Sequence, residues 1–240
     1  MTLQVIMPMG GLGLRFQKEG FVTPKPMILI EGLPMFAKAL KSLDPYDAPK
    51  EVWIVVREDD QLNAGLQSKI KDFYPECSIV KITERTRGAV ETAMKAVPYL
   101  DPDLPLVIMD CDFFFESEEF FQLVNQEESQ VLGGILISFR STNPRYSYAK
   151  LAADGDVVAT SEKNPISDRA LMGAYYFSKA KYFEVGAKEL LAVPLSINMP
   201  EYYVSLVYNI LIQRGHRIKI CEGVFTSFGT PEELSSFLEN

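Results

Sequence analysis

The chain contains 240 residues, 47% of them hydrophobic and 23% charged, a composition typical of a globular protein with a substantial core. Its formal net charge of −8 argues against a nucleic-acid-binding surface, so anionic ligands must be held by local charge. The three cysteines, Cys77, Cys111 and Cys221, are too widely spaced to predict a disulfide framework or a zinc site. With no signal-peptide pattern and no apolar run of membrane-spanning length, we expect a cytoplasmic protein without nucleic-acid or membrane partners.

The first half of the chain alternates short apolar runs with helical patterns, which predicts βαβ units and a parallel sheet. We predict strands at residues 2–7, 51–57, 78–82 and 104–109, and helices at residues 34–43, 59–72 and 89–97. After the first strand, the glycine-rich segment GGLGLR ends in Arg15, and Lys25 follows between two prolines. Glycines let backbone N–H groups approach a polyphosphate closely, and the two cations add charge, so this stretch predicts a phosphate site.

An acidic segment follows the last strand of this first half. The strand at residues 104–109 ends directly in Asp110-Cys111-Asp112. In an open parallel sheet, ligands bind beyond the carboxyl ends of the strands. We therefore expect Asp110 and Asp112 to lie at the same edge of the sheet as the glycine loop.

The second half of the chain has a different pattern. It contains predicted strands at residues 131–140, 146–151, 156–161, 170–177, 217–221 and 224–228, and helices at 179–191 and 201–214. Asp154-Gly155 is a hairpin signal, and a last helix begins at Thr230, with Glu233 completing a capping box. We interpret residues 1–240 as a single domain, with a nucleotide-binding half at about 1–130 and an acceptor-binding half at about 131–240.

Several segments resemble, in the right order, the nucleotidyltransferases that make sugar nucleotides, often called NDP-sugar pyrophosphorylases. They are residues 10–15 (GGLGLR), 24–26 (PKP) and 87–93 (RGAVETA), Asp110 at the end of its strand, and residues 229–234 (GTPEEL). The Glu162-Lys163 pair and the strand at 173–177 are similar to the acceptor half of the family. The resemblance implies an α/β, Rossmann-like fold of the GT-A-like nucleotidyltransferase type. Its mostly parallel central sheet would be flanked by helices and carry a small antiparallel extension on the acceptor side.

The resemblance also implies Mg²⁺-dependent nucleotidyl transfer, in which a phosphate oxygen of an acceptor attacks the α-phosphorus of an NTP and pyrophosphate leaves. The catalytic cations would be Arg15, which neutralises the leaving pyrophosphate, and Lys25, which lies beside the α-phosphate. The nucleotide would be bound by Met9, Gly10, Gly11, Gly13, Arg87 and Gly88. The glycines of the loop would hold the β- and γ-phosphates, and the turn at Arg87 would face the base.

A carboxylate is the expected metal ligand in this family. Asp110 would bind Mg²⁺, a hard cation that prefers carboxylate, phosphate and water oxygens. Many family members carry a second metal-binding Asp two residues before the Gly-Thr of the last motif, where this chain has Ser227. We favour Asp112 as the second carboxylate; the alternative is a metal held more by waters and phosphates.

The acceptor, a small phosphorylated molecule such as a sugar 1-phosphate, would be held by Lys163 at its phosphate and by Glu162 at its hydroxyls. Further acceptor-pocket candidates by position are Tyr148, Asn198, Glu201 and Tyr203, and the strand similar to the family adds Gly173. These assignments depend on the resemblance, because on local grounds Glu162 and Lys163 are a typical exposed pair in a hairpin.

Alternative functions stay open at the level of sequence. A cytidylyltransferase acting on a non-sugar phosphate fits the same motifs, and a GT-A glycosyltransferase would use Asp110-Cys111-Asp112 as a D-x-D motif. A non-catalytic nucleotide-binding subunit is suggested by Ser227, which stands where an acidic ligand is expected. The base of the NTP and the acceptor are not determined, and a homodimer is the default expectation for oligomeric state.

Overall fold

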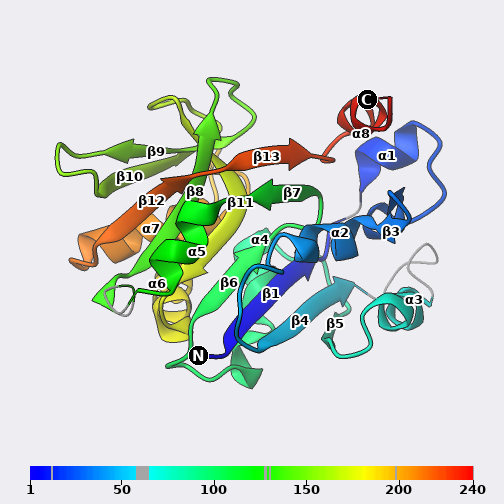
Figure 1. Ribbon diagram of the computed structural model, residues 1–240, viewed down its shortest axis with the longest axis horizontal. Coiled ribbons are helices and arrows are strands. Elements are labelled where there is room, and N and C mark those ends of the chain that lie inside the picture. Colours follow the sequence, from blue (N-terminus) through cyan, green and yellow to red (C-terminus); the bar gives the residue numbers. More distant parts are fainter. Residues whose placement is uncertain (12, 58–64, 127–128, 130, 198, 240) are drawn as a thin grey trace.

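A central sheet runs through the structure, a computed structural model that describes residues 1–11, 13–57, 65–126, 129, 131–197 and 199–239 (Figure 1). Within these described residues the sheet has nine strands. Seven of them follow the order β10-β9-β11-β6-β1-β4-β5, and β8 pairs with both β11 and β12. The chain therefore forms one continuous sheet from strands of both halves of the sequence.

The first half of the chain supplies a parallel group of strands. β1 (Leu3–Met9) lies between β4 (Lys50–Arg57) and β6 (Leu106–Met109), and β5 (Ser78–Ile82) pairs with β4. Each of these pairings is parallel. The strands are apolar runs because helices bury both faces of the sheet, and the predicted βαβ organisation is confirmed.

The second half adds antiparallel strands to the same sheet. β11 (Arg169–Phe177) pairs antiparallel with β6, and also with β8 (Gly134–Arg140) and β9 (Ser147–Leu151). β9 and β10 (Val157–Glu162) form the hairpin predicted at Asp154-Gly155. The strand β12 (Ile218–Glu222) lies parallel to β8 at the edge. The expected α/β fold with an antiparallel extension is thus confirmed.

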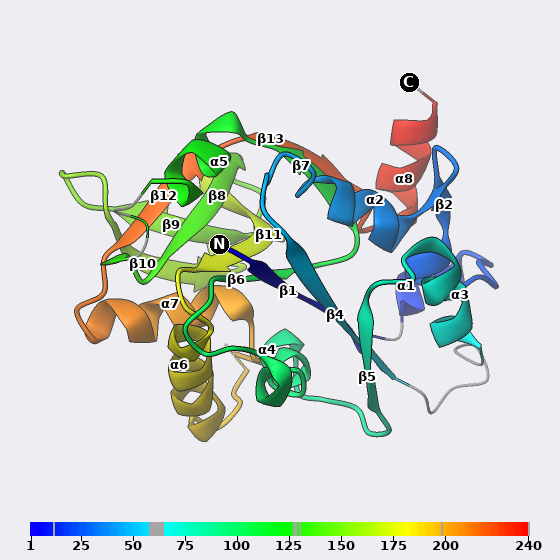
Figure 2. The same ribbon diagram turned by 60° about the horizontal axis from the view of Figure 1, so that its bottom comes forward.

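Helices cover both faces of the sheet, and each face has its own hydrophobic core (Figure 2). One face is packed by α2 (Met35–Lys41) and α5 (Glu118–Val124), through side chains such as Phe36 and Phe120. The other face is packed by α4 (Ala89–Met94), α6 (Ala180–Ala192) and α7 (Val204–Gln213). Buried side chains on this second face include Val90, Phe183 and Val207. This double-sided burial leaves the ends of the strands as the place for a site.

A third, smaller core joins the two ends of the chain. α1 (Leu14–Lys18), the short strands β2 (Leu29–Ile30) and β3 (Leu33–Pro34), and α8 (Pro231–Leu238) surround it. Its buried residues include Phe16, Phe228 and Leu234. The capping box predicted at the start of α8 is confirmed, with Thr230 and Glu233 bonding each other's backbone N–H. The last helix is therefore packed beside the helix that follows the glycine loop (Figure 1).

Some elements differ from the prediction. β7 (Phe113–Glu116) and α5 were not predicted, because the apolar run there shows neither a clear period of two nor of 3.6. β7 pairs with β13 (Val224–Ser227), and Ser117 caps α5 by accepting from the Phe120 N–H. α3 is described from Leu66 to Phe73, whereas the start of the helix predicted at 59–72 lies outside the described residues. α4 ends at Met94, and a 3₁₀ turn, Val97–Tyr99, follows.

We find no described helix that combines the length and the apolar character needed to cross a membrane.

Candidate active site

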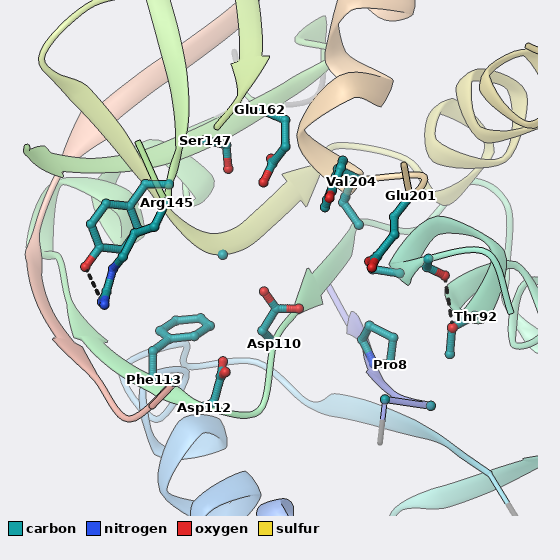
Figure 3. Close-up of a pocket in the computed structure, with 18 of the residues that line it drawn as sticks. Pro8, Thr92, Asp110, Asp112, Phe113, Arg145, Ser147, Glu162, Glu201 and Val204 are labelled. Atoms are coloured by element: carbon teal, nitrogen blue, oxygen red, sulfur yellow. Dashed lines mark hydrogen bonds between the residues drawn. The ribbon is translucent and has the colours of Figure 1, made fainter. Parts of the chain in front are cut away.

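A cavity of about 1120 Å³ lies beyond the carboxyl ends of β1, β4 and β6, as the topology rule requires (Figure 3). The structure brings fourteen of the predicted site residues to its walls: Gly10, Gly11, Gly13, Arg15, Lys25, Arg87, Gly88, Asp110, Asp112, Glu162, Lys163, Gly173, Glu201 and Tyr203. Met9 and Tyr148 are buried and are not among the lining residues, and Asn198 lies outside the described residues. The predicted residues thus converge on one space from both halves of the chain.

The glycine loop lies against the segment that carries Lys25. Gly13 has a left-handed backbone, with φ of 62°, and a Cβ at this position would lie 3.2 Å from the Cβ of Lys25. An L side chain rarely adopts this conformation, so the loop needs glycine to make the turn and the close approach. Lys25 itself begins a short 3₁₀ turn, Lys25–Met27, in which Pro26 fixes the backbone.

Lys25 and Asp112 form an ion pair inside the cavity. The Nζ of Lys25 lies 2.5 Å from Oδ2 of Asp112 and 3.3 Å from the carbonyl oxygen of Gly229. Burial is the largest single effect and by itself would lower the pKa of Lys25, but the charge and hydrogen bond of Asp112, together with the nearby Cys111 and Asp110, raise the pKa above its ordinary value. The ammonium group is therefore charged at neutral pH and is available to a phosphate group.

Asp110 faces the same space from the end of β6. Its side chain is exposed to the cavity, whose walls crowd around the carboxylate. Burial, with repulsion from Asp112 and Glu162, raises the pKa of Asp110 to about 7, against the attraction of Lys25. Among the described residues, no side chain donates a hydrogen bond to this carboxylate. A bound cation would stabilise the charged form of the Asp110 carboxylate.

Gly173 makes room for the Asp110 carboxylate. It interrupts the register of β11 with β8, and its φ is 85°. A Cβ at Gly173 would lie 3.0 Å from Oδ2 of Asp110, and the Gly173 carbonyl accepts from the Asp110 N–H at 3.1 Å. The bulge in β11 therefore positions both the backbone and the side chain of Asp110.

The side of the cavity predicted to bind the acceptor, called here the acceptor side, contains Glu162 and Lys163 at the end of β10. Oε2 of Glu162 accepts a hydrogen bond from the Ser205 hydroxyl at 3.0 Å, and burial raises the pKa of this carboxyl group. Lys163 has a left-handed backbone, with φ of 55°, and its Nζ donates to the Tyr203 hydroxyl at 2.8 Å. Figure 3 shows Glu162 across the cavity from Asp110 and Asp112. An acceptor between them would contact both halves of the fold.

The side of the cavity predicted to face the base is formed by the turn before α4. The Tyr202 N–H donates to the Arg87 carbonyl at 2.9 Å, and the Arg87 guanidinium lies 5.1 Å above the Tyr202 ring. Arg87 is also paired with Glu91, with Nη2 and Oε1 2.7 Å apart. These contacts hold the turn in one place, so its backbone groups are pre-positioned.

Tyr148 lies behind the acceptor wall. Its side chain is fully buried, and its hydroxyl donates to the Asn143 carbonyl at 2.5 Å. The residue therefore anchors the loop between β8 and β9 instead of lining the cavity. The alternating pattern of β9 does not indicate that Tyr148 points away from the cavity. Which face of the strand meets the cavity depends on the neighbouring strands.

Other lining residues were not predicted from sequence. They include Arg57, Thr92, Arg145, Ser147, Ser227 and Glu233. Among them, Arg145 and Glu233 form an ion pair across the acceptor side. The capping box had identified Glu233 only as a helix cap, and no local signal marked Arg145, which sits in an exposed loop.

Comparison with known proteins agrees with this geometry. A family model described as Nucleotidyl transferase matches residues 3–194, and the chain belongs to this family. It is accordingly a nucleotidyltransferase enzyme. A comparison with curated proteins finds no significant match.

Two solved structures share the fold. The crystal structure of the nucleoside-diphosphate-sugar pyrophosphorylase from Vibrio cholerae RC9 is similar with a TM-score of 0.82 and 27% identity, covering 98% of this chain and 100% of that one. A putative glucose-1-phosphate thymidylyltransferase from Bacillus anthracis, solved with a sucrose, has a TM-score of 0.75 and 20% identity. That alignment covers 99% of this chain and 94% of the other, and at this identity it supports the fold alone.

Proposed function

We propose that the protein transfers a nucleotidyl group from an NTP to a small phosphorylated acceptor, most simply a sugar 1-phosphate, with Mg²⁺ as cofactor. The products would be an NDP-linked molecule and pyrophosphate. The observation that carries the proposal is the convergence of the glycine loop, Lys25 and two carboxylates, Asp110 and Asp112, on one cavity with an acceptor wall opposite.

The proposed roles follow from charge and position. Backbone N–H groups of the glycine loop would hold the β- and γ-phosphates, with Arg15 neutralising the leaving pyrophosphate. Lys25 would stabilise charge on the α-phosphate while an acceptor phosphate oxygen attacks the α-phosphorus and the bond to pyrophosphate breaks. Lys163 would bind the acceptor phosphate and Glu162 its hydroxyls, which agrees with their place on the opposite wall.

The donor set fits a hard cation. Asp110 and Asp112 supply carboxylate oxygens, and Asp110 lacks a hydrogen-bond donor within the described residues. The described part of the chain contains no cluster of three or more His, Cys, Asp or Glu side chains able to hold a metal ion. Phosphate and water oxygens would complete the coordination, a pattern usual for Mg²⁺. When bound, Mg²⁺ supplies Lewis-acid stabilisation of the phosphate charge.

Family membership favours this function over the glycosyltransferase and the non-catalytic subunit that the sequence left open. The name of the Vibrio cholerae neighbour supports a sugar phosphate as the acceptor. A cytidylyltransferase acting on a non-sugar phosphate is a distinct outcome of the experiment below. The division into halves at about 1–130 and 131–240, the cytoplasmic location and the homodimer stay predictions.

The test is a screen of four NTPs against a panel of sugar 1-phosphates and other phosphorylated acceptors, with pyrophosphate release as the readout. We expect release that requires both an NTP and an acceptor, and that disappears on chelation of Mg²⁺. Lys25→Ala should slow it by about a hundredfold or more, because a preorganised charge at the transferring phosphoryl group is lost.

The matched control is Lys188→Ala, which removes a lysine from an exposed ion pair on α6, outside the cavity lining. We expect this variant to keep the wild-type rate. A wild type that releases no pyrophosphate with any pair would overturn the proposed function. A Lys25→Ala variant at the wild-type rate would overturn the role of Lys25 alone.

A further inference from the structure

Two ion pairs lie near Gly229 in the wall of the cavity. They are the Lys25–Asp112 pair and the Arg145–Glu233 pair. Oδ2 of Asp112 and Oε2 of Glu233 each lie 3.4 Å from the point that a Gly229 Cβ would occupy. The Arg145–Glu233 pair therefore lies close to the Lys25–Asp112 pair, which contains the proposed catalytic lysine.

Hydrogen bonds hold the Glu233 carboxylate in place independently of Arg145. Its Oε2 accepts hydrogen bonds from the Ser227 hydroxyl at 2.9 Å and from the Thr230 N–H at 3.1 Å, the second being part of the capping box of α8. Its other oxygen, Oε1, pairs with Nη2 of Arg145. The carboxylate thus connects the end of β13, the start of α8 and the loop before β9, with little freedom of its own.

The loop that carries Arg145 is fixed at its backbone. The buried Tyr148 hydroxyl holds the Asn143 carbonyl, and the Asn143 side chain accepts from the Arg145 N–H at 3.2 Å. One residue further, the Tyr146 carbonyl accepts from the N–H of Lys163 at 3.0 Å. This bond holds the backbone next to Arg145 against that of Lys163, while the Lys163 Nζ reaches the Tyr203 hydroxyl and the Arg145 guanidinium reaches Glu233.

The guanidinium of Arg145 contacts a carboxylate and a hydroxyl group, and a ligand can replace both contacts. Its guanidinium donates to the Tyr146 hydroxyl at 2.6 Å and pairs with Glu233, and its side chain is 38% exposed (Figure 3). A planar guanidinium matches the oxygens of a phosphate group in a bidentate way, which an ammonium does not. Arg145 and Lys163 line the same cavity, so a phosphorylated ligand there can contact both cations.

Resting on the proposed function, we propose that Arg145 contacts the phosphorylated acceptor as a second cation beside Lys163. Glu233 is its positioning residue and holds the guanidinium at the cavity wall. Arg145 then determines affinity for the acceptor, whereas the cations proposed for the NTP are Arg15 and Lys25. The same ion pair links acceptor binding to the last helix of the chain.

The experiment compares Arg145→Ala, Arg145→Lys, Glu233→Gln and the double variant by pyrophosphate release, with acceptor and NTP varied in turn. Arg145→Ala should raise the KM for the acceptor about tenfold or more, the range expected for a lost charge-assisted hydrogen bond. The KM for the NTP should stay within about twofold, and Arg145→Lys should recover part of the acceptor affinity. Glu233→Gln keeps a carbonyl oxygen for the cap but loses the ion pair, so a smaller rise of about threefold is expected.

The double variant distinguishes positioning from an independent role. If Glu233 acts through Arg145, adding Glu233→Gln to Arg145→Ala should raise the acceptor KM no further. Arg214→Ala serves as the matched control, because it removes an exposed arginine paired with Glu189 outside the cavity lining. We expect its KM values to equal those of the wild type.

Two results would overturn the inference while the proposed function stands. One is an unchanged acceptor KM in Arg145→Ala. The other is a double variant whose acceptor KM rises by the product of the two single-variant effects. Equal rises in the KM for acceptor and NTP would indicate general damage and would likewise contradict it. Melting temperatures near the wild-type value identify variants that are folded. A wild type without turnover for any NTP and acceptor would overturn the proposed function and the inference with it.

Discussion

The two sides of the cavity are built in different ways. On the side predicted to bind the nucleotide, called the nucleotide side, the lining residues are 10, 11, 13–15, 25 and 85–89, close to the ends of parallel strands. On the predicted acceptor side, Arg145, Lys163, Gly173, Glu201 and Glu233 come from separate segments. A sequence motif can therefore identify the nucleotide side. The acceptor side forms only when several segments that are distant in the sequence pack together.

The difference is also electrostatic. The Lys25–Asp112 pair is deep enough that burial and charge shift the pKa of the lysine in opposite directions. The Arg145–Glu233 pair is nearer the surface, with the Arg145 side chain 38% exposed. We expect the nucleotide side to set the rate of the reaction and the acceptor side to set the choice of substrate, because a deep charge is screened less by solvent.

Asp110→Asn is the strongest test of this contrast, because Asp110 lies where the two sides meet. We expect activity to fall by about a thousandfold at saturating NTP and acceptor, since the amide is a neutral and poorer ligand for a hard cation. Pyrophosphate release at increasing Mg²⁺ is the measurement.

Asp103→Asn is the control for Asp110→Asn, because Asp103 pairs with Lys181 on the exterior and does not line the cavity. It should keep both the rate and the Mg²⁺ dependence of the wild type. An Asp110→Asn variant with the same Mg²⁺ dependence as the wild type would remove Asp110 from the metal site.

Gly173→Ala tests whether the bulge in β11 serves the site. Gly173 and Gly155 both have a φ of 85°, so alanine should destabilise either position by about 1–2 kcal/mol. Only at Gly173 does the added Cβ meet Asp110, at 3.0 Å from its Oδ2, whereas nothing lies within 4 Å at Gly155. We expect Gly173→Ala to lose about a hundredfold in rate through a displaced carboxylate, and Gly155→Ala to lose none.

Urea unfolding and steady-state rates, measured on the two glycine variants side by side, separate strain from function. If both variants lost activity in the same proportion, the conformation alone would explain the loss. If neither lost activity, the contact between Gly173 and Asp110 would have no catalytic consequence.

The smallest expected effect concerns the hairpin of β9 and β10. Asp156 forms ion pairs with Arg217 and with Lys219 of β12, and these lower its pKa, with the Arg217 hydrogen bond as the main cause. A lowered pKa stabilises the fold above the unfolded value of about 4 and ceases to do so as the pH falls through the folded value. Asp156→Asn should therefore cost up to about 1 kcal/mol at pH 7.

This cost should shrink as the pH falls below about 4, because the wild-type carboxylate is then protonated as well. Unfolding free energies in urea at several pH values give the comparison, and Asp47→Asn, an exposed Asp with no ion pair in the described part of the chain, is the control. A difference that does not change with pH would show that the carboxylate charge is not its source.

Local sequence patterns were sufficient where one segment carries its own structural reason. The strand-loop-helix order around β1 follows from an apolar run and glycines, and the capping box at Thr230 and Glu233 formed as predicted. Local patterns failed for β7 and α5, whose aromatic residues fit a strand or a helix equally. Pairing with β13 decides that β7 is a strand, and packing on the sheet decides that α5 is a helix. Tyr148 was misplaced for a related reason, since the face of β9 that meets the cavity is set by β10 and β11.

By itself, the sequence determined the family resemblance, the parallel strands and the composition of the nucleotide side, because these depend on residues that are neighbours along the chain. Only the tertiary structure decided that Asp110 needs the space left by Gly173, and that Glu233 reaches Arg145. Both contacts join residues separated by more than sixty positions, and their geometry depends on how β6, β11, α8 and the loop before β9 pack together. Such distances leave no periodic trace in the sequence, so the acceptor side becomes visible only in the fold.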